Sequence, residues 1–139
     1  MKTTLAISQM SVSKDYEENI KKATQLIREA KSKGADLILL QELFERPYFC
    51  QIEDYERFDY AEEYEHSKTL EYFQKLAKEL EIVLPISFFE KSGNCYYNSI
   101  CVIDKDGERK GLYRKTHIPT GQCYEEKFYF APGDTGYQV

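Results

Sequence analysis

The hydrophobic pattern of the chain begins with a short apolar segment followed by an amphipathic helix. Residues 3–9 (TTLAISQ) predict a strand, and Asp15 is a suitable N-cap with Glu18 at the third helical position. Gly34 supplies the stop signal. The apolar positions between cap and stop recur at three- and four-residue spacing: Tyr16, Ile20, Ala23, Ile27 and Ala30. This single stripe predicts a helix that covers a sheet with one face.

The run Leu37–Leu40 is apolar at consecutive positions, which predicts a strand buried on both faces. Strand, helix and strand then form a β-α-β start. A second amphipathic helix follows a tyrosine-rich, acidic connector, with Ser67 as its cap. Residues 82–89 (IVLPISFF) predict the next strand, and Pro85 favours an edge or irregular position because it lacks one ladder donor. The stripe of the second helix is Leu70, Phe73, Leu76, Ala77 and Leu80.

Turn signals at 91–94 (KSGN) and 105–107 (KDG) separate strands at 96–103 and 109–114, which predicts an antiparallel meander. The expected fold class is therefore α/β, with a mixed sheet and two amphipathic helices on one face. Residues 135–139 (TGYQV) look like the onset of a strand. We therefore expect the chain to stop within an element, as a truncated domain would.

Length and composition narrow the class of protein. The 139 residues fit one domain with a real core, and the net charge of −5 argues against nucleic acid as a partner. No apolar run is long enough to cross a bilayer, and the N-terminus lacks the apolar core of a signal peptide, so we expect a cytoplasmic protein without a membrane partner.

The four cysteines show no Cys-x-x-Cys pair and no nearby histidine couple, so we expect no zinc site and reduced thiols. Cys95 and Cys101 share parity on a predicted strand. Their shared parity favours two small buried side chains on one face.

Three polar residues lie at positions where chemistry is possible. Glu42 follows the apolar run 37–40, and a half-desolvated carboxylate at a strand end suits a general base. The alternative is a surface glutamate, or one paired with Arg46. Lys115 ends the strand 109–114 and could stabilise developing negative charge, although most lysines are solvated surface charges. His117 could bind substrate or could form a structural hydrogen bond.

Two acidic segments also contain candidate functional residues. Of Glu125 and Glu126, one is expected to lie against apolar surface beside the aromatic residues 128–130, and the other to face water. Residues 53–66 carry seven acids against Arg57 alone. This segment could attract a cationic substrate, but a solvated connector is the favoured interpretation.

Together these segments resemble the nitrilase, or carbon-nitrogen hydrolase, superfamily. GADLILLQELF is similar to the segment that carries the family's catalytic glutamate, GLYRKTHIP to its lysine segment, and YEEKFYFAPGD to the stretch that follows. The resemblance implies that Glu42 is the general base, that Lys115 stabilises the oxyanion, and that Glu126 is a second glutamate that supports substrate placement and proton transfer. It also implies substrate-binding roles for Tyr48 and His117, and no metal or cofactor.

The resemblance further implies a four-layer α-β-β-α sandwich, of which residues 1–139 would be the N-terminal part of a single domain about twice this length. The nucleophilic cysteine of the family lies some tens of residues beyond its lysine. Cys123 follows Lys115 by only eight residues, and the other three cysteines precede it, so none matches the motif. We therefore expect the isolated chain to be inactive.

Within the superfamily, the segment ELFERPYFCQIEDYERFDYAE is most similar to the enzymes that hydrolyse N-carbamoylputrescine to putrescine, CO2 and ammonia. The acids of 53–66 suit the ammonium group of that carbamoyl amine. The alternative is a carbamoyl-β-alanine hydrolase, for which Arg46 or Arg57 would hold the substrate carboxylate. A different possibility is an interaction subunit that pairs with a C-terminal half. The family also implies a homo-oligomer.

Overall fold

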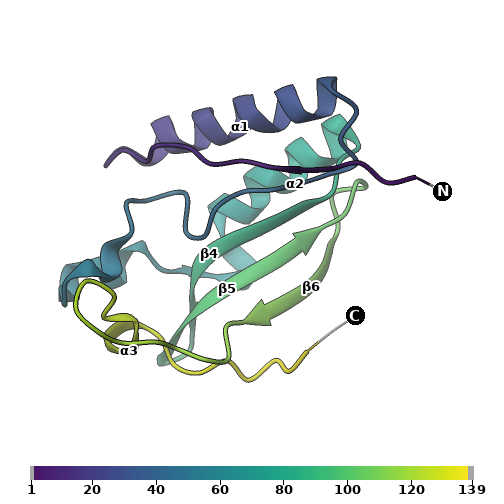
Figure 1. Cartoon of the computed structure of the whole chain (residues 1–139). Helices are drawn as coiled ribbons and strands as arrows, with labels where there is room; N and C mark the ends of the chain where they lie inside the picture. Colours follow the sequence, from purple (N-terminus) through teal and green to yellow (C-terminus); the bar gives the residue numbers. More distant parts are fainter. Residues whose placement is uncertain (1, 138–139) are drawn as a thin grey trace.

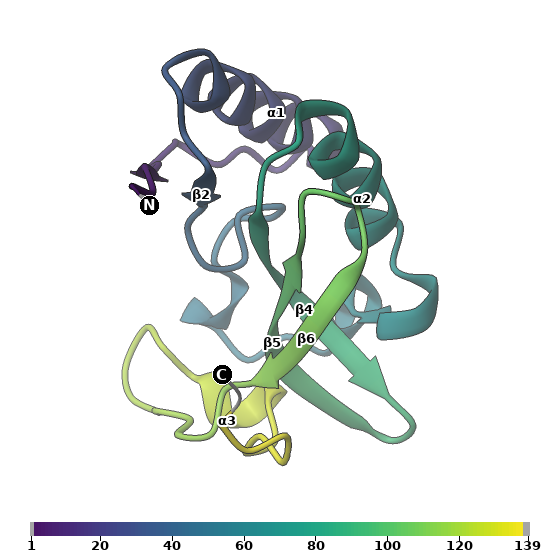
Figure 2. The same ribbon diagram turned by 90° about the vertical axis from the view of Figure 1, so that its right-hand side faces the viewer.

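The computed structural model describes residues 2–137, in which two long helices cover one face of a mixed sheet (Figure 1). Figure 2 shows the same arrangement from the side, with the short helix α3 at the end of the molecule opposite α1. The elements in chain order are β1 (Leu5–Ile7), α1 (Tyr16–Ser32), β2 (Leu37–Leu39), the 3-10 turns η1 (Phe49–Gln51) and η2 (Tyr55–Tyr60), β3 (Glu62–Glu63), η3 (Tyr64–His66), α2 (Lys68–Leu80), β4 (Leu84–Ser92), β5 (Cys95–Ile103), β6 (Arg109–Arg114) and α3 (Glu126–Tyr129).

The sheet is mixed, as predicted, and its topology brings the carboxyl ends of two strands to the same end of the sheet. β1 pairs with β2 in parallel, and a parallel bridge between Leu37 and Val83 joins β2 to the start of β4. β4, β5 and β6 form the predicted antiparallel meander, and β3 pairs with the far end of β4. β6 therefore runs parallel to β2. The chain segments that follow β2 and β6 therefore leave the sheet at the same end, where the carboxyl ends of these two strands lie. Ligand sites commonly form at this end of a sheet.

Both helices begin at the predicted caps. The Asp15 carboxylate accepts the Glu18 N–H at 3.2 Å, and the Ser67 hydroxyl accepts the Leu70 N–H at 3.0 Å. Each cap satisfies a backbone donor that the first turn leaves unpaired. The apolar stripes of both helices pack on one face of the sheet, and the core between them contains Ile20, Ala23, Ile27, Ile38, Leu70, Phe73, Leu76, Ala77, Leu84, Ile86, Phe88, Cys101 and Ile103.

The acidic connector is only partly a solvated segment. Glu62 accepts hydrogen bonds from the Ser67 hydroxyl at 2.5 Å and the Thr69 hydroxyl at 3.1 Å, so it supports the start of α2. Asp54 caps η2 and pairs with Arg57 at 2.9 Å. The other five acids of residues 53–66 are exposed, in agreement with the favoured interpretation: Glu53, Glu56, Asp59, Glu63 and Glu65.

The opposite face of the sheet carries apolar side chains that remain exposed. The prediction that residues 37–40 form a strand buried on both faces is wrong for this chain, because Leu39 is 41% exposed while its neighbour Ile38 packs against the helices. Leu5, Ile7 and Val102 are also exposed. Since consecutive strand residues point to opposite faces, the helices cover only one of the two apolar faces.

Pro85 has an irregular position, as expected, because it pairs with Val102 of β5 but within residues 2–137 has no ladder partner on the other side of β4, where the bridge to β2 stops at Val83. Two further expectations differ from the structure. Cys101 is buried as expected, but Cys95 is exposed because it begins β5 beside the hairpin turn. Residues 135–137 form no strand, and residues 138 and 139 lie outside the described part.

The segment 131–134 (APGD) fixes the end of β6 through backbone contacts. The Ala131 N–H donates to Tyr96 O at 2.8 Å, and the Gly133 N–H donates to Lys115 O at 2.9 Å. A Cβ atom at Gly133 would lie 2.0 Å from the Arg114 carbonyl oxygen, so only glycine permits this approach. Between residues 2 and 137, no helix is long and apolar enough to cross a membrane.

Glu45 is a buried carboxyl in the turn after β2. Its Oε2 atom has no hydrogen-bond partner within residues 2–137. Burial raises the pKa of Glu45 to about 7, and the nearby Glu62 carboxylate adds to the shift while Arg46 opposes it. The protonated form is therefore favoured in the folded chain over a range in which an unfolded glutamate is ionised.

This pKa predicts that stability falls as pH rises. The contribution of Glu45 is fully present below its ordinary pKa, about 4.5, and is lost as pH rises through about 7. Glu45→Gln keeps the shape without the charge, so we expect the variant to gain roughly 1–3 kcal/mol over the wild type between pH 5 and pH 8. The measurement is urea unfolding across that range. The exposed Glu71→Gln is the control, and parallel stability curves for wild type and Glu45→Gln would contradict the assignment.

Candidate active site

Glu42 lies in a turn that a strained residue and a buried hydroxyl hold in place. Leu43 has a left-handed backbone conformation with a φ of 50°, which is costly for a side chain of its size. Its N–H donates to the Ser87 hydroxyl on β4 at 3.0 Å, and its side chain is buried. The Glu42 side chain, 49% exposed, thus lies on the sheet face opposite the helices, beside β5 and β6.

Lys115 follows β6 and points to the same open face. Its backbone N–H donates to Asn98 O on β5 at 2.8 Å. The alternation of the strand separates it from Arg114, which turns to the other face and pairs with the buried Glu90 at 2.5 Å. The Lys115 ammonium donates to Glu42 Oε1 at 3.3 Å and to Glu126 Oε2 at 2.8 Å, so it bridges the two carboxylates.

Glu126 is buried at the start of α3, whereas Glu125 is partly exposed, as predicted for this pair. Glu126 accepts the Tyr48 hydroxyl at 2.7 Å through Oε1, while Oε2 accepts Lys115. Residues 126–129 form a helical turn, and the neighbouring aromatic side chains of Tyr129 and Phe130 are both buried. The end of this helix belongs to a second apolar cluster, which consists of Leu43, Phe49, Cys50, Phe89, Ile118, Tyr129 and Phe130.

The charges around Lys115 explain its protonation state. Partial burial lowers the pKa of Lys115, but the hydrogen bonds and charges of Glu126 and Glu42 outweigh it and raise the pKa above its ordinary value. Burial and the neighbouring Glu126 also raise the pKa of Tyr48. At neutral pH the site therefore holds an ammonium cation between two carboxyl groups, with a phenol that stays neutral and donates a hydrogen bond.

Asn98 belongs to the same group of hydrogen-bonded residues as Glu42, Lys115 and Glu126, although no sequence motif pointed to it. It is 5% exposed, and its side-chain N–H donates to Glu42 Oε1. Glu42, Lys115 and Asn98 line a hollow of about 280 Å³ whose other walls are mainly apolar: Leu39, Leu40, Ser87, Ser99, Ile100 and Tyr113. Convergent polar groups in an apolar hollow are the usual features of a small-molecule site.

The structure places the two predicted substrate-binding residues, Tyr48 and His117, in different surroundings. Tyr48 contacts Glu126 and so belongs to this group of hydrogen-bonded residues, whereas His117 is exposed and makes no hydrogen bond with Glu42, Lys115 or Glu126. His117 lies beside a separate hollow with Lys127 and Pro132. Arg46 does not pair with Glu42 either, because its guanidinium lies over the rings of Tyr16 and Tyr60, 5.1 and 4.6 Å from their centroids.

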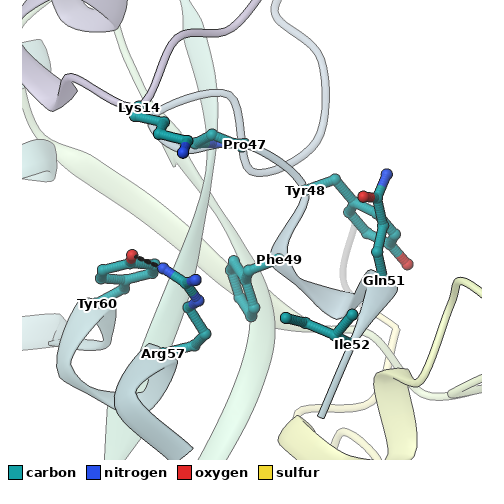
Figure 3. A pocket seen from close by; sticks show the side chains of 8 residues that line it. All are labelled: Lys14, Pro47, Tyr48, Phe49, Gln51, Ile52, Arg57 and Tyr60. Atoms are coloured by element: carbon teal, nitrogen blue, oxygen red, sulfur yellow. Dashed lines mark hydrogen bonds between the residues drawn. The ribbon is translucent and has the colours of Figure 1, made fainter. Parts of the chain in front are cut away.

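A second pocket of about 260 Å³ lies on the other side of the loop that carries Tyr48 (Figure 3). Lys14, Arg57 and Tyr60 surround the Phe49 ring there, and Figure 3 shows the Tyr48 and Gln51 side chains turned away from Lys14 and Tyr60. Arg57 is already paired with Asp54 and Tyr60. Glu42, Lys115 and Glu126 do not line this pocket, whereas Tyr48, which binds Glu126, does.

The cysteines of the chain are poorly suited to act as nucleophiles at this site. Cys50 is fully buried, and its burial together with the charges of Glu126 and Glu42 raises the pKa of its thiol to about 12. Burial raises the pKa of Cys101 to about 11. Cys95 and Cys123 are exposed, and neither lines the hollow of Glu42 and Lys115. A thiol with a pKa well above 7 is almost entirely un-ionised and unreactive.

Comparisons with known proteins identify the family. The model of the carbon-nitrogen hydrolase family matches residues 4–139. An N-carbamoylputrescine amidase from Oryza sativa subsp. japonica is 52% identical over 99% of this chain, and a citrullinase from Francisella tularensis is 43% identical over 97%. The chain covers 46% and 47% of these relatives, about half their length.

A solved structure supports the same assignment. The carbon-nitrogen hydrolase from Helicobacter pylori G27 superimposes with a TM-score of 0.90 at 37% identity, over 96% of this chain and 46% of that one. Its similarity in fold and sequence agrees with the match to the family model. The chain therefore belongs to the carbon-nitrogen hydrolase family.

Proposed function

We propose that this chain forms the glutamate-lysine-glutamate part of a carbon-nitrogen hydrolase that cleaves N-carbamoylputrescine. The observation that carries the proposal is the Lys115 ammonium held between Glu42 and Glu126 at the open face of the sheet. Residues 1–139 would be the N-terminal part of a single hydrolase domain. The nucleophilic thiol would come from a segment corresponding to the second half of the relatives, because none of the four cysteines here suits the role.

The proposed reaction divides the work among three groups. Glu42 accepts the proton of the nucleophilic thiol, and the thiolate attacks the carbamoyl carbon. Lys115 stabilises the oxyanion that forms. The C–N bond to putrescine then breaks, and the leaving amine takes the proton from Glu42. Water, activated by Glu42, releases the S-carbamoyl group as carbamate, which decomposes to CO2 and ammonia.

Glu126 and Tyr48 would keep Lys115 in position during this cycle. Glu126 is buried, and Lys115 and Tyr48 each donate a hydrogen bond to one of its two oxygens. The ammonium therefore has a fixed partner when Glu42 becomes protonated. This arrangement supports the role of Glu126 as the second glutamate, and the proposed role of Tyr48 in substrate binding rests on its bond to Glu126. His117 has no contact with these groups, and its proposed role in binding substrate rests on the family resemblance alone.

The substrate assignment rests on the relatives and on charge. N-Carbamoylputrescine and citrulline share the ureido group and an amine four carbons away, and citrulline has an additional carboxylate. A substrate carboxylate would need a free arginine or lysine. Arg46 is stacked on two tyrosine rings and Arg57 is paired with Asp54, so neither of the suggested clamps is free. Their engagement favours the substrate without a carboxylate.

The uncovered sheet face suggests how the site is completed. Leu5, Ile7, Leu39 and Val102 are exposed on the face that also carries Glu42 and Lys115. We propose that the second half of the domain packs on this face, whether in the same polypeptide or as a separate subunit. An apolar sheet face seldom remains uncovered. The alternative of a pure interaction subunit predicts binding to such a half without hydrolysis of any amide.

A lysine substitution tests the proposed oxyanion role. In the polypeptide that combines this chain with the second half found in its relatives, we expect Lys115→Met to lower kcat by about 10²–10³, because it removes the charge-stabilising donor. The measurement is ammonia release from N-carbamoylputrescine. Lys110→Met on β6, the strand that precedes Lys115, is the matched control, since within residues 2–137 Lys110 pairs only with the surface acids Asp106 and Glu108. Equal kcat values for the two variants would contradict the role, and residues 1–139 alone should release no ammonia.

A substrate panel tests the specificity. We expect kcat/KM for N-carbamoylputrescine to exceed that for citrulline and for N-carbamoyl-β-alanine by at least about tenfold, because a carboxylate without a cationic partner is costly to desolvate. The measurement compares ammonia release from the three compounds under the same conditions. A preference for N-carbamoyl-β-alanine would exclude the putrescine assignment, and a preference for citrulline would show that a carboxylate clamp exists outside the residues described here.

A further inference from the structure

Asn98 is a buried polar residue of the candidate site to which the proposed chemistry assigns no role. It lies on β5 opposite Phe89, on the strand that separates β4 from β6. Its side-chain amide donates to Glu42 Oε1, and its backbone carbonyl accepts the Lys115 N–H at 2.8 Å. One residue therefore contacts both segments that leave this end of the sheet, through two different groups.

We propose that Asn98 is a positioning residue that orients the general base Glu42 toward its proton donor, an inference that rests on the proposed function. Both donors to Glu42 reach the same oxygen, since Asn98 Nδ2 and Lys115 Nζ each donate to Oε1. Oε2 has no hydrogen-bond partner within residues 2–137. The amide thus fixes the rotation of the carboxylate so that Oε2 is the oxygen that accepts the proton.

The position of Asn98 suits this role better than a purely structural one. Glu42 is half exposed and lies in a turn without a sheet partner, so its side chain would otherwise be free to rotate. Asn98 is on a central strand and 95% of its surface is buried, which makes its amide a rigid reference point. The amide is also neutral, so it restrains the carboxylate without neutralising it as a second ammonium would.

The two contacts of Asn98 can be separated by mutation. A side-chain substitution removes the bond to Glu42 but leaves the backbone bond that holds Lys115. In the same combined polypeptide, we expect Asn98→Ala to lower kcat by about 10–100-fold with KM changed by less than about threefold. Asn98→Asp, which keeps the size but not the donor, should not restore kcat.

The decisive comparison is a double variant. A residue that acts through Glu42 has nothing left to position once the base is removed, so Asn98→Ala should have no further effect on kcat in a Glu42→Gln background. Multiplying effects in the double variant would overturn the proposal. Asn19→Ala is the control for a lost buried amide, because among the described residues the Asn19 side chain bonds only to the backbone of Ser13 and Glu45. It should lower stability without changing kcat per folded molecule.

A second readout separates this inference from the proposed function. In NMR spectra, the side-chain amide resonances of Asn98 should shift as Glu42 ionises in the wild type, and this pH dependence should vanish in Glu42→Gln. A wild type that hydrolyses no amide or carbamoyl compound would refute the proposed function, and the NMR titration would still decide whether Asn98 binds the Glu42 carboxylate. Asn98 resonances unaffected by Glu42→Gln would overturn the positioning role.

Discussion

The ion pair network around Lys115 is the interaction on which the site depends. A lysine ammonium between two carboxylates, 3.3 Å from Glu42 and 2.8 Å from Glu126, is stable only if the backbone brings three distant segments together. Without Lys115, two carboxyl groups would approach each other at a partly desolvated surface. Without the two carboxylates, partial burial would lower the pKa of Lys115. The three charges therefore require one another.

Much of the scaffold serves to bring these segments together. The strained turn at Leu43, held by Ser87, sets the start of the Glu42 loop, and the glycine approach at Gly133 fixes the backbone of Lys115. The second apolar cluster contains Tyr129 and Phe130 and so anchors α3, which carries Glu126. Such rigid supports are expected where charged groups must keep a fixed geometry and little water is present to screen or reorient them. The two long helices α1 and α2 stabilise the sheet, whereas the short helix α3 supplies Glu126 to the candidate site.

The local patterns in the sequence predicted the elements well, because caps and periodicity act over a few residues. Asp15 and Ser67 cap the helices as expected, and the meander from 84 to 114 follows its turn signals. The same patterns failed where the exposure of a side chain depended on what covers it. Leu39 is exposed because nothing within residues 2–137 covers the second face of the sheet, and Cys95 is exposed despite its parity because the hairpin turn lies beside it.

The residues of the candidate site also differ in how far the sequence alone could predict them. Glu42, Lys115 and Glu126 could be selected only through the order of three motifs, since each alone resembles a surface charge. Asn98 gave no such signal, because an asparagine within a strand looks the same whether it faces solvent, core or a catalytic carboxylate. Its role follows from the strand register, which pairs it with Phe89 and brings it to Lys115. Sequence pattern thus recovers the charged groups, and the neutral residue that orients them requires the fold.

Titration of the Lys115 side chain by heteronuclear NMR tests the ion pair network most directly. The network predicts a pKa above the ordinary value in the wild type, because Glu126 and Glu42 outweigh the partial burial of the ammonium. In Glu126→Gln the pKa should fall, since the closer carboxylate is lost while the burial remains. A Lys115 pKa at or below the ordinary value in the wild type, unchanged by Glu126→Gln, would contradict the network.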